Sequence, residues 1–170
     1  MNCIADSIIL RKLSMEDYPT VLEWSRDISF CEANGWDLNR TSDEIYDWWL
    51  RCVNHSADDF IRMGIEFHGR LIGYVDLACI QDNTAEIGIA IGDSSLWGRG
   101  IGKGSLLNAM NYGFYSMGIT TFYAETHEAN VRSRSMLEHF GFEEISRSGT
   151  EVYLGKMNQL IQYRVCKEAK

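Results

Sequence analysis

Four glycines alternate with basic and apolar residues in one short stretch of the chain, "LWGRGIGKGSLL" (Leu96–Leu107). Glycine has no Cβ atom, so the backbone N–H groups of such a segment can approach anionic oxygens closely. A helix that begins behind the segment adds unpaired N–H donors and a partial positive charge. Arg99 and Lys103 add full positive charges. The stretch therefore indicates a site for a triphosphate, a dinucleotide or the pyrophosphate of coenzyme A. A glycine-rich turn without a ligand is the alternative.

The spacing of the glycines distinguishes between these three kinds of ligand. The triphosphate pattern GxxxxGK[ST] fails, because Gly104 stands where Ser or Thr is required and no glycine lies five positions before Gly102. The dinucleotide pattern GxGxxG fails because its last glycine would fall on Lys103 or Ser105, and the strands before it form no βαβ unit. The pattern [QR]xxGx[GA] fits Arg99–Gly104.

Hydrophobic periodicity predicts the elements that must position this stretch, in the order β-α-α-β-β-β-α-β-α-β-β. Two helix starts are predicted, one at Ser14 and one at Thr41 or Ser42, each with acidic residues close behind. Three consecutive strands with short turns predict an antiparallel meander directly before the glycines. A polar stretch with Gly149 and Gly155 is expected to join the last two strands. The predicted strands cover 7–13, 59–67, 71–80, 84–93, 120–127, 142–147 and 159–165, and the predicted helices cover 14–27, 41–54, 105–117 and 129–142.

Composition narrows the class of protein. A chain of 170 residues with 45% hydrophobic and 24% charged residues is typical of one globular domain, expected over residues 1–170. The net charge of −8 argues against a nucleic-acid partner and slightly favours a cationic one, although solubility alone also explains it. Five cysteines without a CxxC pair favour reduced thiols in a cytoplasm over disulfides or a metal site. The sequence has no secretion signal and no apolar run that could span a membrane.

Together these motifs resemble the GNAT superfamily of N-acetyltransferases. The meander, "LWGRGIGKG", the helix behind it and "HEANVRSRSMLEHFGF" follow the family's order over nearly the whole chain. The segments "ILRKLSMEDYPTVLEW" and "QLIQYRV" look most like the RimJ/RimL-type branch. The resemblance implies an α/β (α+β) fold: a mixed, mostly antiparallel twisted sheet of about six to seven strands flanked by about four helices. It also implies that the sheet is splayed between strands 84–93 and 120–127.

The resemblance further implies a site for acetyl-coenzyme A in that splay, and no metal. The pantetheine arm would pair with the strand edge at Ile89 and Ile91. Asn130 would reach the same arm, and the alternative for Asn130 is a helix-capping residue that binds its own backbone. The residues whose amides would hold the pyrophosphate are Arg99, Gly100, Ile101, Gly102, Lys103 and Gly104.

Amine acetylation requires a base, since free alkyl amines are mostly protonated at neutral pH. Glu86 lies 13 positions before Arg99 in "AEI", which resembles the placement of the base in the histone acetyltransferase branch. A partly exposed strand glutamate without a catalytic role is the alternative. Asp76 and Glu125 are weaker candidates for the base, and Glu32 could face a cationic substrate.

The proton donor for the leaving thiolate is less clear from the sequence. Many family members carry a tyrosine seven residues after the asparagine, and here that position is Leu137. Tyr123 and His127 are the candidate replacements, water is another, and Tyr153 and Tyr163 are more distant ones. Cys79 has no evident histidine partner, which favours direct transfer over a covalent mechanism.

The sequence thus predicts transfer of acetyl to a primary amine, either a small molecule or a protein N-terminus. The acceptor pocket is expected around residues 27–39. A homodimer is compatible with the family. A coenzyme A-binding module with little or no turnover is the alternative function.

Overall fold

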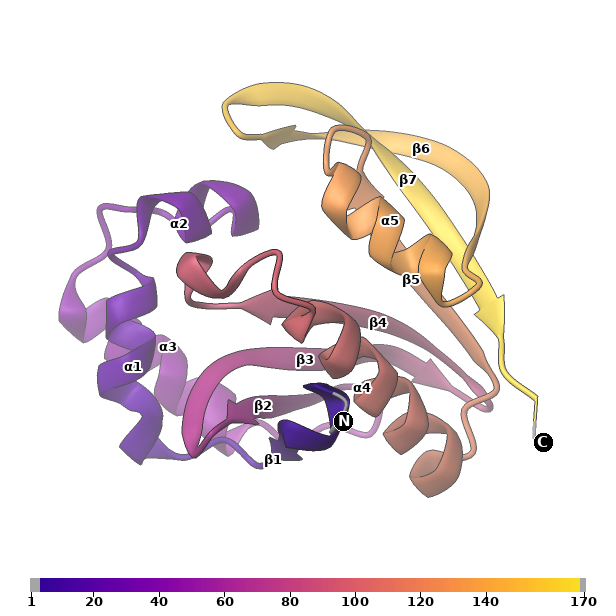
Figure 1. Cartoon of the computed structure of the whole chain (residues 1–170). Helices are drawn as coiled ribbons and strands as arrows, with labels where there is room; N and C mark the ends of the chain where they lie inside the picture. The colour runs from indigo at the N-terminus through magenta and orange to yellow at the C-terminus, as the bar shows by residue number, and fades with distance from the viewer. Residues whose placement is uncertain (1–3, 169–170) are drawn as a thin grey trace.

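The computed structural model describes residues 4–168, so Cys3 lies outside the described residues. Seven strands form one continuous sheet in the order β1-β2-β3-β4-β5-β7-β6 (Figure 1). β4 and β5 pair in parallel, and the other neighbours are antiparallel. The strands are β1 (Ile8–Arg11), β2 (Ile61–Phe67), β3 (Arg70–Gln81), β4 (Thr84–Ile91), β5 (Thr121–His127), β6 (Glu143–Tyr153) and β7 (Lys156–Cys166).

Five α-helices pack against this sheet in two groups. Residues of α4 and α5 share one hydrophobic core with the sheet, where Leu106 and Leu137 pack with Ile87. Residues of α1, α2 and α3 form a second core, which Ala90 of β4 joins. Since alternate residues of a strand face opposite sides, the two helix groups cover opposite faces. The helices are α1 (Tyr18–Trp24), α2 (Ile28–Asn34), α3 (Ser42–Asn54), α4 (Ile101–Met117) and α5 (Val131–His139).

Local sequence signals explain several of these boundaries. Ser14 and Thr41 each form a capping box with an acidic residue three positions later, as predicted. Between Ser14 and the first turn of α1 the chain makes a short 3-10 helix, Met15–Asp17. Tryptophans 24, 36, 48 and 49 pack in or against the second core.

The structure differs from the predicted elements at several places. A fifth helix, α2, forms inside 27–39, because Asp27 caps it by accepting from the N–H of Phe30 and Gly35 ends it in a left-handed conformation. α4 begins at Ile101 rather than at 105, so two glycines lie in its first turn. β1 is shorter than expected. The polar stretch before 159 continues both last strands, which turn only at Leu154 and Gly155, both with positive φ.

The sheet splays where the resemblance to the family implied. β4 and β5 share three pairs of residues, from Thr84 with Thr121 to Glu86 with Tyr123. Beyond Glu86, β4 continues to Ile91 without a pair on β5, while β5 continues to His127 paired with β7. The two halves of the sheet therefore part over the last five residues of β4.

Candidate functional site

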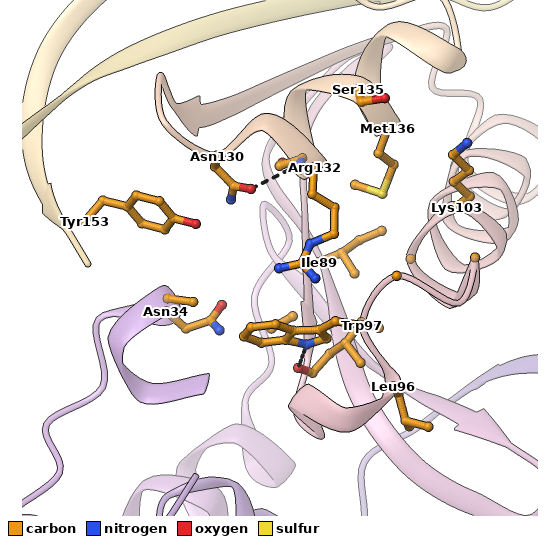
Figure 2. A pocket seen from close by; sticks show the side chains of 17 residues that line it. Asn34, Ile89, Leu96, Trp97, Lys103, Asn130, Arg132, Ser135, Met136 and Tyr153 are labelled. Carbon is orange, nitrogen blue, oxygen red and sulfur yellow. Dashed lines mark hydrogen bonds between the residues drawn. The ribbon is translucent and has the colours of Figure 1, made fainter. Parts of the chain in front are cut away.

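A pocket of about 350 Å³ lies where the two strands part. Its walls come from the end of β4, the loop and first turn of α4, the start of α5, the end of α2 and the end of β6. Figure 2 shows these side chains gathered around one space, with Lys103 and Tyr153 on opposite sides of the view. Segments far apart in the sequence thus form one site.

The open edge of β4 offers backbone hydrogen-bonding groups to this pocket. The N–H of Gly92 donates to Ile72 of β3 at 2.7 Å. Since the backbone groups of neighbouring strand residues point to opposite sides, Ile89 and Ile91 direct theirs toward the open side. The carbonyl of Ile91 already accepts a hydrogen bond from Nε1 of Trp97 at 3.0 Å, drawn in Figure 2. Ile89 is therefore the residue whose edge groups are best placed for an extended ligand.

The start of α4 forms the second part of the pocket. Gly100 has a φ of 83°, a conformation that favours glycine, and its carbonyl accepts the first helical bond, from the N–H of Gly104 at 3.1 Å. The N–H groups of Ile101, Gly102 and Lys103 thus precede the helical ladder and can bind an anion. A Cβ atom on Gly102 would lie 3.3 Å from Sδ of Met136, so the missing side chain keeps this wall open.

The glycine stretch divides into residues that line the pocket and residues that do not. Gly100, Gly102 and Lys103 line it, whereas the side chain of Ile101 is buried in the core. A Cβ atom on Gly104 would lie 2.8 Å from Ile8 and 3.2 Å from the backbone of Ala5, so packing against the N-terminal segment requires this glycine. Arg99 is exposed and lies outside the pocket lining.

Asn130 fits both of the roles that the sequence left open. Its Oδ1 accepts a hydrogen bond from the N–H of Ser133 at 3.1 Å, which caps α5. The same residue lines the pocket, as Figure 2 shows. Because capping uses only the side-chain oxygen, its amide N–H₂ group can still donate to a ligand.

The three residues expected to be catalytic lie outside the pocket lining. Glu86 stands at the last parallel pair, three residues before Ile89, which is about 10 Å along a strand. Partial desolvation, followed by the negative charge of Glu125, raises the pKa of Glu86 above its ordinary value. Tyr123 lies opposite Glu86 and is 37% exposed.

The weaker candidates for the base are engaged or distant. Asp76 accepts two hydrogen bonds from Arg62, at 2.6 and 2.7 Å. Glu125 accepts one from Nε2 of Gln162 at 2.8 Å. Glu32 is exposed on α2 and does not line the pocket. Asp76 and Glu125 thus have side-chain partners, whereas Glu86 makes no side-chain hydrogen bond or ion pair within the described residues.

The candidate proton donors differ in whether they line the pocket. His127 is largely buried and its ring stacks on that of Tyr153 at 4.5 Å, so it lies behind the pocket wall. Leu137 is 3% exposed and packs in the first core. The hydroxyl of Tyr163 accepts a hydrogen bond from Nε of Arg134 at 3.2 Å, and its ring is buried. Tyr153, by contrast, lines the pocket itself.

Sequence reasoning missed several residues of the site. Trp97 and Arg132 line the pocket from opposite sides of the splay, and the Arg132 guanidinium lies 4.7 Å from the centre of the Trp97 ring. Asn34 of α2 and Met136 of α5 also line it. Trp97 could have been suspected from its place beside the first glycine, but nothing local marks the others.

The described residues contain neither a cluster of metal ligands nor a helix that could span a membrane. Between residues 4 and 168 no group of three or more His, Cys, Asp or Glu side chains could hold a metal ion. None of the helices in that range has the length and hydropathy that a membrane span requires. The four cysteines described are free thiols.

Solved structures with a similar fold include acetyltransferases crystallised with coenzyme A. Spermidine N-acetyltransferase from Vibrio cholerae, in complex with CoA and spermine, has a TM-score of 0.79 at 19% identity, covering 95% of this chain and 96% of that one. RimL, the ribosomal L7/L12 alpha-N-protein acetyltransferase, in complex with coenzyme A, has a TM-score of 0.80 at 16% identity, covering 99% and 98%. RimJ of Mycobacterium smegmatis has a TM-score of 0.78 at 20% identity, covering 94% of this chain and 81% of that one.

Two curated proteins are similar to this chain in sequence. An uncharacterised protein of Methanocaldococcus jannaschii is 28% identical over 158 residues, which are 89% of this chain and 31% of that protein. An N-acetyltransferase 9-like protein of Nematostella vectensis is 39% identical over 66 residues, 39% of this chain and 33% of that protein. The chain thus spans about a third of the length of these curated relatives. The family described as Acetyltransferase (GNAT) domain matches residues 7–143, most of the chain, and the chain belongs to that family.

Proposed function

We propose that this chain transfers an acetyl group from acetyl-coenzyme A to a primary amine by direct attack in a ternary complex. The single observation that supports this best is the pocket at the splay, where an open strand edge meets the unpaired N–H groups of a helix start. Acetyl-coenzyme A supplies an activated acetyl thioester. The chain supplies binding, orientation and proton transfer.

The proposed coenzyme A site uses backbone groups first. The N–H groups of Ile101, Gly102 and Lys103 would hold the pyrophosphate, with the ammonium of Lys103 adding charge. The edge of Ile89 would pair with the extended pantetheine arm, as a strand does. Its N–H is also a suitable donor to the carbonyl oxygen on which negative charge develops.

Arg132 is a second cation for the phosphates, because its guanidinium lies over Trp97 at the pocket wall. The amide of Asn130 would donate to the pantetheine arm. Ile101 would contribute its N–H while its side chain packs in the core. The N–H of Gly104, expected from the sequence to hold the pyrophosphate, instead donates to Gly100. Arg99 would reach the phosphates from the surface, outside the pocket lining.

Glu86 is the proposed base. Its raised pKa improves its ability to accept a proton near neutral pH, and it carries no ion pair that would hold it in another role. Since about 10 Å of strand separate it from Ile89, the proton would pass from the amine to Glu86 through water.

The acceptor is proposed to enter beside α2, where Ala33 and Asn34 line the pocket. Among the fold relatives, one structure holds spermine, and another enzyme acts on a ribosomal protein. A polyamine and a protein α-amino group are therefore the two acceptor classes to test first. The net charge of −8 favours a cationic acceptor in either case.

The competing function is a coenzyme A-binding module without turnover, favoured by the leucine at position 137 where family members carry a tyrosine. Thiol release from acetyl-coenzyme A, measured with a panel of polyamines, amino sugars and peptides with free N-termini, distinguishes the two. Release that depends on one acceptor class supports the enzyme. Binding of coenzyme A by calorimetry without release with any acceptor would support the module.

A further inference from the structure

Tyr153 is the single buried residue of an otherwise exposed strand. All ten residues of β6 before it are exposed, whereas Tyr153 is 7% exposed. It pairs with Lys156 across the turn of Leu154 and Gly155, so the end of the hairpin fixes its place. Figure 2 shows its ring reaching into the pocket, with the hydroxyl beside Asn130 and on the same side as Asn34. The hairpin thus delivers one phenol to the site.

The ring of Tyr153 is held from behind, and its hydroxyl is left for a ligand. The His127 ring stacks on it at 4.5 Å with an angle of 12° between the planes. Nε2 of His127 is buried without a hydrogen bond, 3.5 Å from a carboxylate oxygen of Glu151. Within residues 4–168 the Tyr153 hydroxyl makes no hydrogen bond to the protein. A buried ring with an unpartnered hydroxyl that faces a pocket is placed to act on a bound molecule.

Other groups in the pocket are less suitable proton donors to a thiolate. An ordinary phenol has a pKa of about 10, near that of a thiol. The pKa of an alkyl hydroxyl, as in Ser133 and Ser135, is much further from it. The Arg132 guanidinium does not give up a proton in proteins. Lys103 stands at the start of α4, where it would bind an anion, on the other side of the pocket in Figure 2.

We propose that Tyr153 is the general acid of this site, and the proposal rests on the acetyl transfer proposed above. As the amine nitrogen bonds to the acetyl carbon, the carbon–sulfur bond breaks and its electron pair stays on sulfur. Tyr153 donates its phenolic proton to that sulfur and regains a proton from solvent. His127 is the positioning residue, because it contacts the ring and not the reacting atoms. The proton donor would therefore come from the β6–β7 hairpin, whereas many family members use a tyrosine on a helix.

The test compares Tyr153→Phe with the native chain, using acetyl-coenzyme A and an acceptor from the amine panel. The substitution keeps the stacked ring and removes a hydroxyl that stabilises no protein contact, so the thermal midpoint and coenzyme A binding should stay the same. Turnover should fall by about 10²-fold or more with KM for both substrates unchanged. The defect should shrink as the pH rises past the thiol pKa, about 8.5 for an ordinary thiol, because a thiolate then leaves without a proton. Tyr115→Phe is the matched control, since Tyr115 is 75% exposed on α4.

The outcomes separate this proposal from the proposed function. If Tyr153→Phe retains native turnover, Tyr153 is not the acid, while acetyl transfer by the native chain still stands. If its KM for the amine rises and kcat is kept, Tyr153 binds the acceptor and the proposal is overturned. If the native chain releases no thiol with any amine, the proposed function fails before the variants are compared, and the acid role fails with it.

Discussion

Glu86 and Tyr123 lie opposite each other in the last of the three parallel pairs that join β4 to β5, and the strands part directly beyond them. The base proposed from the sequence therefore stands at the apex of the splay rather than inside the pocket. The open edge of β4 begins one residue later. A single register position thus places the carboxylate about 10 Å along the strand from Ile89, the residue whose edge is proposed to bind the acetyl donor.

Glu86→Gln should retain the fold and lose the base. Removal of a general base costs about 10²- to 10⁴-fold in turnover. The loss should be largest near neutral pH and should shrink at high pH, where the free amine is abundant. Steady-state thiol release measures this when it is followed from about pH 6 to about pH 10, close to the ordinary pKa of an alkyl amine. A variant with native turnover at neutral pH would remove Glu86 from the mechanism.

Glu125→Gln should change the pH dependence without removing the base. The negative charge of Glu125 adds to the desolvation that raises the pKa of Glu86, so its removal should lower that pKa. Glu86 must be ionised to accept a proton, and activity is therefore lost as the pH falls through its pKa. The acid limb of the rate profile should move to lower pH in the variant. The amide oxygen can still accept from Gln162, which keeps the local structure. If the acid limb of the rate profile stays at the same pH, a group other than Glu86 produces it.

Much of the fold could be predicted because its signals are local. The capping pairs that begin with Ser14 and Thr41 mark helix starts with residues three positions apart. The glycine stretch has the spacing expected of a phosphate-binding helix start within nine residues, and the short turns of the meander determine the antiparallel order of β2, β3 and β4. The splay itself was predicted by the resemblance to a family rather than by the residues alone.

The features that the sequence missed, or in the case of Tyr153 ranked low, depend on contacts between distant segments. α2 is short, and Asp27 caps it while also accepting from the hydroxyl of Ser94, a residue 67 positions away. Tyr153 lies in a strand whose sequence is polar, and only the course of the hairpin brings it to the pocket. Arg132 meets Trp97 across the splay. No periodicity within one segment contains such information.

Gly102→Val should abolish binding of coenzyme A while the chain remains folded. The new side chain branches at a Cβ atom that already lies 3.3 Å from Sδ of Met136, and it would occupy the space beside the N–H groups proposed to hold the pyrophosphate. Met136 has a flexible side chain and can yield, so the fold should survive. Calorimetry with acetyl-coenzyme A, and with ATP and NAD as negative controls, measures binding, and thermal unfolding checks the fold. Binding as tight as in the native chain would place the phosphates elsewhere.

Leu137→Tyr should destabilise the chain without creating a proton donor. Leu137 is 3% exposed and packs in the core that α4 and α5 share with the sheet. A larger side chain with a hydroxyl has no room and no partner there, and overpacking of this kind typically costs about 1–3 kcal/mol. The free energy of unfolding, measured in denaturant, should fall accordingly, with the kinetics of the folded fraction unchanged. The same substitution in a Tyr153→Phe background should fail to restore turnover, because the new hydroxyl would not face the pocket. Restored turnover would instead show that a side chain at position 137 can reach the leaving sulfur. The native leucine would then leave the site without the proton donor that many family members have there.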